Sequence, residues 1–214
     1  MKPRITSIVG YLRASLPLCA LGALLALAGC EVTDPTELVV LVDTDLPIAS
    51  QSGEPALAGE LRSVRFDVEC LAAEGDPPCR LRGGEASTFT GLEQSYEAAG
   101  LGARPPFYFV LRRDVAGVQR TFRITATAAV GPLDDAQTIS STVSAETVEG
   151  EARVVVLALR EDCVDVMCAD GTSCALGGGC GPIAQTAAPW PGSCAAVGRP
   201  GLAMAECEDD LFSP

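Results

Sequence analysis

Apolar and polar side chains alternate along much of the segment from residue 37 to residue 160. In SVRFDVEC (63–70), every second side chain is apolar and those between are charged. TFRITATAAV (121–130) and FYFVLR (107–112) show the same period of two. A period of two places alternate side chains on opposite faces of a strand. Each of these segments is therefore predicted to be a half-buried β-strand.

Two other segments are almost continuously apolar and β-branched, namely ELVVLV (37–42) and RVVVLAL (153–159). This pattern is typical of strands that are covered on both faces. STFTG (87–91) and TISSTVSAETV (138–148) are weaker strand candidates, rich in Thr and Ser. Residues 96–106 show neither period, and we expect them to form a loop that crosses between sheets.

Turn signals with Gly, Pro and Asp separate these segments, for example EGDPP (74–78) and GPLDD (131–135). Seven or eight short strands without a convincing 3.6-residue period predict a mainly β protein, an antiparallel β-sandwich over residues 37–160. About 120 residues suffice for one such core. In architecture this resembles immunoglobulin-like or fibronectin-type domains, although the only Trp is Trp190, so the buried-Trp signature is missing. A fold of this kind does not imply a function.

The first thirty residues have the features of an export signal. A basic segment with Lys2, Arg4 and Arg13 precedes an uncharged run, SLPLCALGALLALAG, which ends at Cys30. A run of about 15 residues is shorter than the roughly 20 that a transmembrane helix needs, and it matches the apolar region of a signal peptide. An ordinary secretory signal or an N-terminal anchor helix are the alternatives.

The sequence LAGC (27–30) resembles the lipobox of bacterial lipoprotein precursors. The resemblance covers residues 1–30 and implies a signal peptide over 1–29, a lipidated tether over 30–36 and a diacylglycerol on Cys30. It also implies an amide-linked acyl chain, such as palmitate, on the new N-terminus. Two or more chains anchor a protein firmly. Glu31 follows the cysteine, and by the enteric sorting rule this favours the outer membrane.

Charge and missing residue types exclude several functions. Cleavage before Cys30 leaves 12 basic and 28 acidic residues, a formal charge of −16. That balance opposes binding to nucleic acid and adhesion to anionic lipid. The chain has no His and no Asn, and its only Lys is Lys2. Ser-His-Asp, Cys-His and Ser-Lys catalysis are therefore excluded, and we expect no enzyme, no cofactor and no metal.

Cysteine spacing divides the chain into a body and a tail. Cys70 and Cys79 flank the EGDPP turn, and in an exported protein they predict a disulfide across it, with a reactive thiol pair as the alternative. Residues 161–214 hold six more cysteines: Cys163, Cys168, Cys174, Cys180, Cys194 and Cys207. The spacing is wider than that of zinc knuckles and the count is even, which favours disulfides. We therefore expect a disulfide-rich tail after the sandwich.

The first four tail cysteines resemble half of an EGF-like knot, with the form C-x4-C-x2-G-x2-C-x5-C. This resemblance favours pairing Cys163 with Cys174 and Cys168 with Cys180, although four cysteines permit three connectivities. Cys194 with Cys207 would close a third loop. The nearby acids Glu161, Asp162, Asp165 and Asp170 suggest calcium, but LREDC departs from the lead-in of calcium-binding EGF modules, and no EF-hand loop is present.

As a whole, the lipobox, the TELVVLVDTDL strand, the β body and the cysteine-rich tail resemble a group of predicted envelope lipoproteins from GC-rich Gram-negative genomes. The resemblance concerns the architecture and implies no activity. We expect a lipid-anchored, non-enzymatic module that binds an envelope or extracellular partner, and protein is favoured over glycan because only Tyr96, Tyr108 and Trp190 could form aromatic platforms. The alternatives are a structural spacer, a calcium-binding adhesion module, or an enzyme using carboxylates such as Asp43, Asp45, Asp134 and Asp135, with or without a metal.

Overall fold

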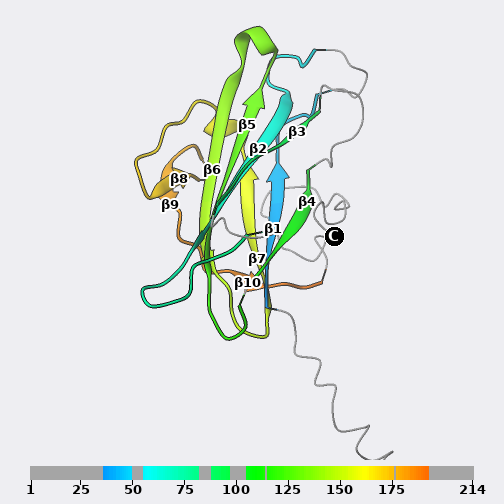
Figure 1. The fold of residues 1–214 in the computed structure, drawn as a ribbon. Helices are drawn as coiled ribbons and strands as arrows, with labels where there is room; N and C mark the ends of the chain where they lie inside the picture. The colour runs from blue at the N-terminus through cyan, green and yellow to red at the C-terminus, as the bar shows by residue number, and fades with distance from the viewer. Residues whose placement is uncertain are drawn as a thin grey trace, which may run out of the picture. The chain divides into compact units, whose positions relative to one another are not determined.

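The computed structural model describes residues 36–49, 55–81, 88–96, 105–113, 115–175 and 177–192. Within these residues the protein is mainly β, with two four-stranded sheets and one two-stranded hairpin (Figure 1). Two short 3-10 helices, η1 (Leu133–Asp135) and η2 (Glu161–Cys163), interrupt the strands. The signal-peptide region 1–29, the tether up to residue 35 and the tail beyond residue 192 lie outside the described residues.

The first sheet has the strand order β10-β7-β1-β4. Its strands are β1 (Glu37–Thr44), β4 (Phe107–Arg112), β7 (Ala152–Leu159) and β10 (Ala188–Pro189). β1 and β7, the two continuously apolar strands, lie side by side in the middle of the sheet. Their pairing is parallel, from Glu37 opposite Ala152 to Thr44 opposite Leu159.

The predicted antiparallel pairing is confirmed for the other strand pairs in the described residues, and the parallel pair of β1 and β7 is the exception to it. A parallel pair needs a long connection, and here nearly the whole body of the chain lies between β1 and β7. The apolar runs agree with this arrangement, because parallel strands are normally buried on both faces, but cover on both faces does not by itself set the direction of a strand.

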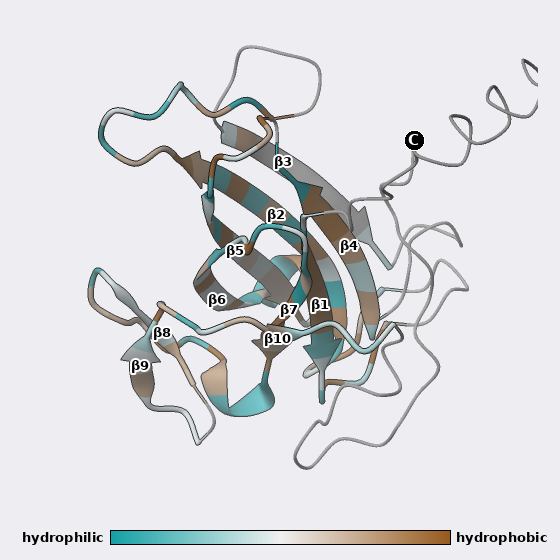
Figure 2. Cartoon of the chain, turned by 90° about the horizontal axis from the view of Figure 1, so that it is seen from below, coloured by the Kyte–Doolittle hydropathy of each residue, from teal (hydrophilic) through white to brown (hydrophobic). Residues whose placement is uncertain are grey.

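The second sheet has the order β3-β2-β5-β6. Its strands are β2 (Leu61–Leu71), β3 (Thr88–Ser95), β5 (Thr121–Val130) and β6 (Gln137–Glu146). β5 has the bounds that the alternating pattern predicts, and the Thr/Ser-rich segment forms β6. Figure 2 shows the alternation as hydrophilic and hydrophobic bands along the long strands.

The two sheets contribute side chains to one buried cluster. Phe66 of β2 packs edge-on against Phe107 and Phe109 of β4, with ring centroids 5.9 and 5.4 Å apart. Every second residue of β1 and β7 points into the same cluster, including Val40 and Leu157. Because β3 belongs to the second sheet and β4 to the first, the chain crosses between sheets after Tyr96, as expected.

The outer face of the first sheet is also apolar. Val39, Leu41 and Val154 are buried there in a separate cluster, with Tyr108 and Trp190 packed against it. β1 is therefore buried on both faces, as its continuous apolar run predicts.

Candidate functional site

Two disulfides hold the start of the cysteine-rich tail together. Cys163, buried in η2, is bonded to Cys174, and Cys168 is bonded to Cys180. These are the pairings that the EGF-like resemblance favours. Cys174 and Cys180 face each other across the hairpin of β8 (Thr172–Cys174) and β9 (Cys180–Pro182). We call residues 161–182 the disulfide module.

Glycine and aspartate close the module locally. The Asp162 carboxylate accepts a hydrogen bond from the backbone N–H of Gly177 at 2.7 Å. Gly178 has a φ of +72°, and a Cβ on it would lie 2.7 Å from the carbonyl oxygen of Asp162. Within the glycine run at 177–179, position 178 therefore has no room for a side chain.

The disulfide module lies along the outer edge of β6. Asp165 accepts the backbone N–H of Thr138 at 3.1 Å and donates its own N–H to the Thr138 carbonyl at 2.8 Å. The Ser173 hydroxyl accepts the N–H of Thr142 at 2.8 Å. These bonds satisfy edge groups that would otherwise be available for pairing with another chain.

The chain after the module links both sheets, and we call residues 183–190 the strap. Ser144 of β6 donates its N–H to Ile183 at 2.8 Å and accepts the N–H of Gln185 at 2.9 Å. Three residues further, β10 pairs antiparallel with β7, and Trp190 donates its N–H to Ala152 at 2.9 Å. The strap therefore connects the edge of the second sheet to the edge of the first.

A groove of about 570 Å³ separates the disulfide module from the outer face of β5 and β6. Its sheet side is hydroxyl-rich, with Thr125 and Thr142 only 3.0 Å apart at their hydroxyl oxygens. Its module side carries Met167, which is 95% exposed. The groove is chemically mixed and has no concentration of charge.

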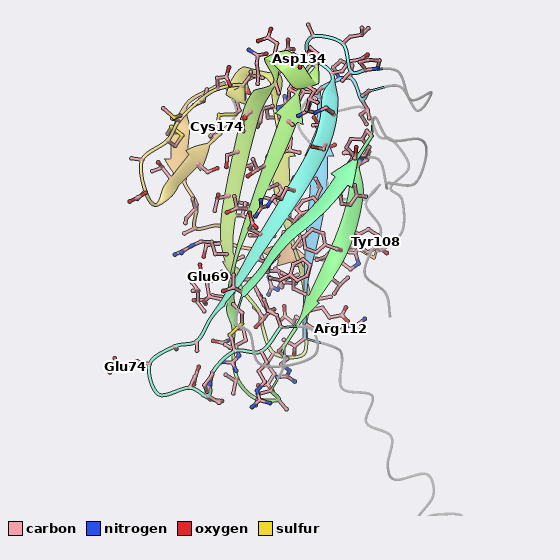
Figure 3. The ribbon with its side chains drawn as sticks, turned by 45° about the horizontal axis from the view of Figure 1, so that its top comes forward. Glu69, Glu74, Tyr108, Arg112, Asp134 and Cys174 are labelled. Atoms are coloured by element: carbon pink, nitrogen blue, oxygen red, sulfur yellow. A yellow bond between two sulfur atoms is a disulfide. The ribbon has the colours of Figure 1, made fainter. Side chains whose placement is uncertain are left out.

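The four carboxylates considered for catalysis occupy different environments. Asp43 is buried at the end of β1 and accepts the N–H of Thr44 at 3.0 Å. Asp45 forms an ion pair with Arg160 at 3.1 Å and accepts the N–H of Glu161 at 2.9 Å. Asp134 and Asp135 are exposed in η1, between β5 and β6 (Figure 3, Asp134).

Two of the four acids considered for calcium accept hydrogen bonds from backbone N–H groups instead. Asp162 and Asp165 hold backbone groups of the tail and of β6, as described above, whereas Glu161 and Asp170 are exposed. Within the described ranges, no three residues among His, Cys, Asp and Glu come together as a possible metal site.

The three aromatic candidates do not form a common platform. Tyr96 is buried in the core between the sheets. Tyr108 of β4 and Trp190 at the end of the strap contact each other on the outer face of the first sheet, with ring centroids 5.4 Å apart. Sequence reasoning could not pair them, because 82 positions separate them.

The remaining cysteines divide by position. Cys70 and Cys79 form the expected disulfide, and both are buried at the edge of the core. Cys30, the predicted lipidation site, and the pair Cys194 and Cys207 lie outside the described residues.

Sequence reasoning missed Arg120, a fully buried arginine whose guanidinium donates to the Pro77 carbonyl at 2.9 Å. No local pattern marks it, since it lies just before a strand among ordinary turn residues.

No protein-family model, no curated protein and no solved structure matches this chain. In the part of the chain that the structure describes, no helix has the length and apolar character needed to cross a bilayer.

Proposed function

We propose that this chain is a non-enzymatic lipoprotein of the bacterial envelope, anchored through Cys30, in the outer membrane. Its body is an immunoglobulin-like β-sandwich of seven or eight strands, and it acts as a module that binds an envelope or extracellular protein. The observation that best supports a location outside the cytoplasm is the set of three disulfides in the described residues, Cys70–Cys79, Cys163–Cys174 and Cys168–Cys180. Disulfides of this kind persist in oxidising compartments, where the LAGC motif would deliver the chain.

The strap supports a binding or structural role. It joins the two sheets by backbone hydrogen bonds at Ser144 and Ala152, so the sheets form one rigid support for the loops at their ends. Binding residues are commonly placed on loops that a rigid scaffold positions.

Exposed apolar side chains indicate which loops could contact a partner. Leu57 and Leu133 are 67% and 76% exposed. They lie in adjoining turns, because Gly131 donates its N–H to the Glu60 carbonyl at 2.8 Å. Exposed apolar groups that are close together favour protein contact more than isolated ones do.

The anchor is tested by the intact mass of the protein extracted from membranes. We expect a mature chain that starts at Cys30 and carries three acyl chains. Reduction should add eight hydrogen masses, two for each of four disulfides, Cys194–Cys207 included. An unmodified Cys30 would contradict the anchor, and a smaller shift would contradict the disulfide assignment.

Partner binding is tested by affinity capture from detergent-solubilised envelope. The double variant Leu57→Ser/Leu133→Ser should lose a partner that the parent protein captures. Val115→Ser is the matched control, since Val115 is also exposed but lies in the loop before β5, at the opposite end of the strands. Absence of any specific partner, or equal capture by the double variant, would contradict a binding role for these turns.

A further inference from the structure

The sandwich has two ends that are defined by the direction of β1. The near end contains Glu37, where the chain enters β1, and the segment that precedes β7, since Glu37 donates its N–H to Glu151 at 3.1 Å. The start of β5 lies there too, because Thr147 donates its N–H to the Arg120 carbonyl. The far end contains the end of β1, η1 and η2. Figure 3 shows Glu74 and Asp134 at these opposite ends.

Most of the carboxylates without an arginine partner in the described residues lie at the far end. They belong to the turn before β2, to η1 and to the start of the disulfide module, and five of the six are exposed. They are Glu60, Asp134, Asp135, Glu161, Asp162 and Asp165. At this end Arg160 is already paired with Asp45 at 3.1 Å. Arg62, near the start of β2, is the other arginine described at this end and balances one of the six charges.

The near end is almost balanced in charge. Four of its arginines are paired with glutamates, three of them at N–O distances of 2.8 to 3.1 Å. The pairs are Arg112–Glu37, Arg113–Glu149, Arg123–Glu69 and Arg153–Glu151. The other charged residues described at this end are three acids and two arginines, which together give a net charge of −1. They are Glu74, Asp76, Glu146, Arg80 and Arg120. The protein is therefore electrically asymmetric along its strands.

The number of residues between Cys30 and β1 limits how far the near end can lie from the proposed lipid anchor. Six peptide units join Cys30 to Thr36, and fully extended they span about 20 Å. β5, with ten residues, is about 30 Å long. The tether is therefore shorter than the body and does not let it invert, so the anchored body either stands on its near end or tilts until its far end comes close to the bilayer.

We propose that the near end of the anchored protein faces the anionic surface of the bilayer and that the far end points away from it. This inference rests on the lipid anchor proposed above. Anionic lipid attracts basic segments and repels acidic ones within a Debye length of about 8 Å at physiological salt. Tilting the far end down would bring six carboxylates and only one further arginine, Arg62, into that layer, whereas the near end adds almost no net charge to it.

The orientation places Leu57 and Leu133 at the end remote from the membrane, where another envelope component can reach them. It also gives the acidity of the chain a physical role, because the same charge that prevents adhesion to lipid keeps the body upright on its tether.

The absence of lysine from the mature chain allows a direct test with the full-length lipidated protein. Glu74→Lys and Asp134→Lys each introduce a single amine for an amine-reactive dye, and the labelled side chain is neutral, so both variants change the charge equally. The parent protein, which has no lysine after cleavage, measures background labelling. Each labelled protein is inserted into phosphatidylglycerol-containing vesicles that carry a short-range spin-label quencher on a lipid headgroup.

We expect the dye at position 74 to be quenched several-fold more strongly than the dye at position 134. The difference should shrink in phosphatidylcholine vesicles and at 1 M salt, where the Debye length falls to about 3 Å. Equal or reversed quenching in anionic vesicles, from protein that floats with them, would overturn the orientation while leaving the anchor intact. Failure of the protein to float with vesicles would instead overturn the anchor. A difference that is unchanged in neutral vesicles and high salt would overturn the electrostatic cause.

Discussion

Gly178 lies so close to Asp162 that a Cβ atom on the glycine would come within 2.7 Å of the aspartate carbonyl oxygen. Gly178 also has a φ of +72°, a conformation that residues with a side chain adopt at a cost. Gly178 thus packs closely against η2, the helical turn that contains Asp162 and Cys163, and only glycine fits there without strain. The position of a Cβ is fixed by the backbone and its neighbour would be a backbone oxygen, so no side-chain rotation could relieve the overlap.

Gly178→Ala should therefore destabilise the disulfide module by about 1–3 kcal/mol, from strain at positive φ and from the steric overlap. The measurement is the rate at which Cys163–Cys174 and Cys168–Cys180 are reduced under native conditions, which should rise in the variant. Gly179→Ala is the control, because a Cβ there meets nothing within 4 Å and the residue does not have a positive φ. Equal reduction rates for the two variants would show that the contact is unimportant.

Arg120 should contribute more to stability than a surface arginine. Its side chain is 1% exposed, and it donates to the Pro77 carbonyl at 2.9 Å. Arg120→Ala should lower the free energy of unfolding by about 2–4 kcal/mol, because it leaves a cavity and unsatisfied polar groups. The measurement is urea denaturation.

Arg123→Ala is the matched control for Arg120, three residues further along the chain. Arg123 pairs with Glu69 at 3.0 Å, but both side chains are more than 40% exposed. Removing such a surface pair should cost less than about 1 kcal/mol. If Arg123→Ala cost as much as Arg120→Ala, burial would not be the reason for the effect.

The disulfide between Cys70 and Cys79 should stabilise the folded state by about 2–3 kcal/mol, since it closes a short loop in the unfolded chain. The double variant Cys70→Ala/Cys79→Ala should unfold at a correspondingly lower urea concentration. Both sulfurs are buried at the core, so alanine is a better replacement than serine. The single variant Cys70→Ala is the comparison, because it leaves Cys79 as a buried free thiol. An unchanged unfolding midpoint in the double variant would contradict the prediction.

The strap should protect the edge of β6. Gln185→Pro removes the N–H that donates to the Ser144 carbonyl at 2.9 Å, and the loss should cost about 1–3 kcal/mol locally. We expect faster hydrogen exchange at the Ser144 amide and stronger self-association, because an uncovered edge strand can pair with another chain. Gln185→Ala keeps the N–H and removes only an exposed side chain, so it should behave like the parent. Similar exchange at Ser144 in both variants would show that the strap is not needed there.

Most strands could be predicted from the sequence because each depends on local alternation. A side chain at every second position is either buried or solvated, and this difference is visible in the order of residues along β2, β4 and β5. The continuous apolar runs of β1 and β7 likewise predicted cover on both faces. The three described disulfides could be predicted from the cysteine spacing, from the export signal, which implies an oxidising compartment, and from the EGF-like resemblance.

The sequence by itself determined the long strands of the two sheets, the spacing of the cysteines and the imbalance of charge, because these depend on residue type and spacing along the chain. Only the tertiary structure decided that β1 and β7 run parallel, that residues 183–190 link both sheets, and that Arg120 is buried. These features join residues separated by 27 to 115 positions. Their pairing follows from which faces and edges come together in space, and local periodicity carries no record of that. The same holds for the acids: their number is set by the sequence, but only the fold places most of those without an arginine partner in the described residues at one end.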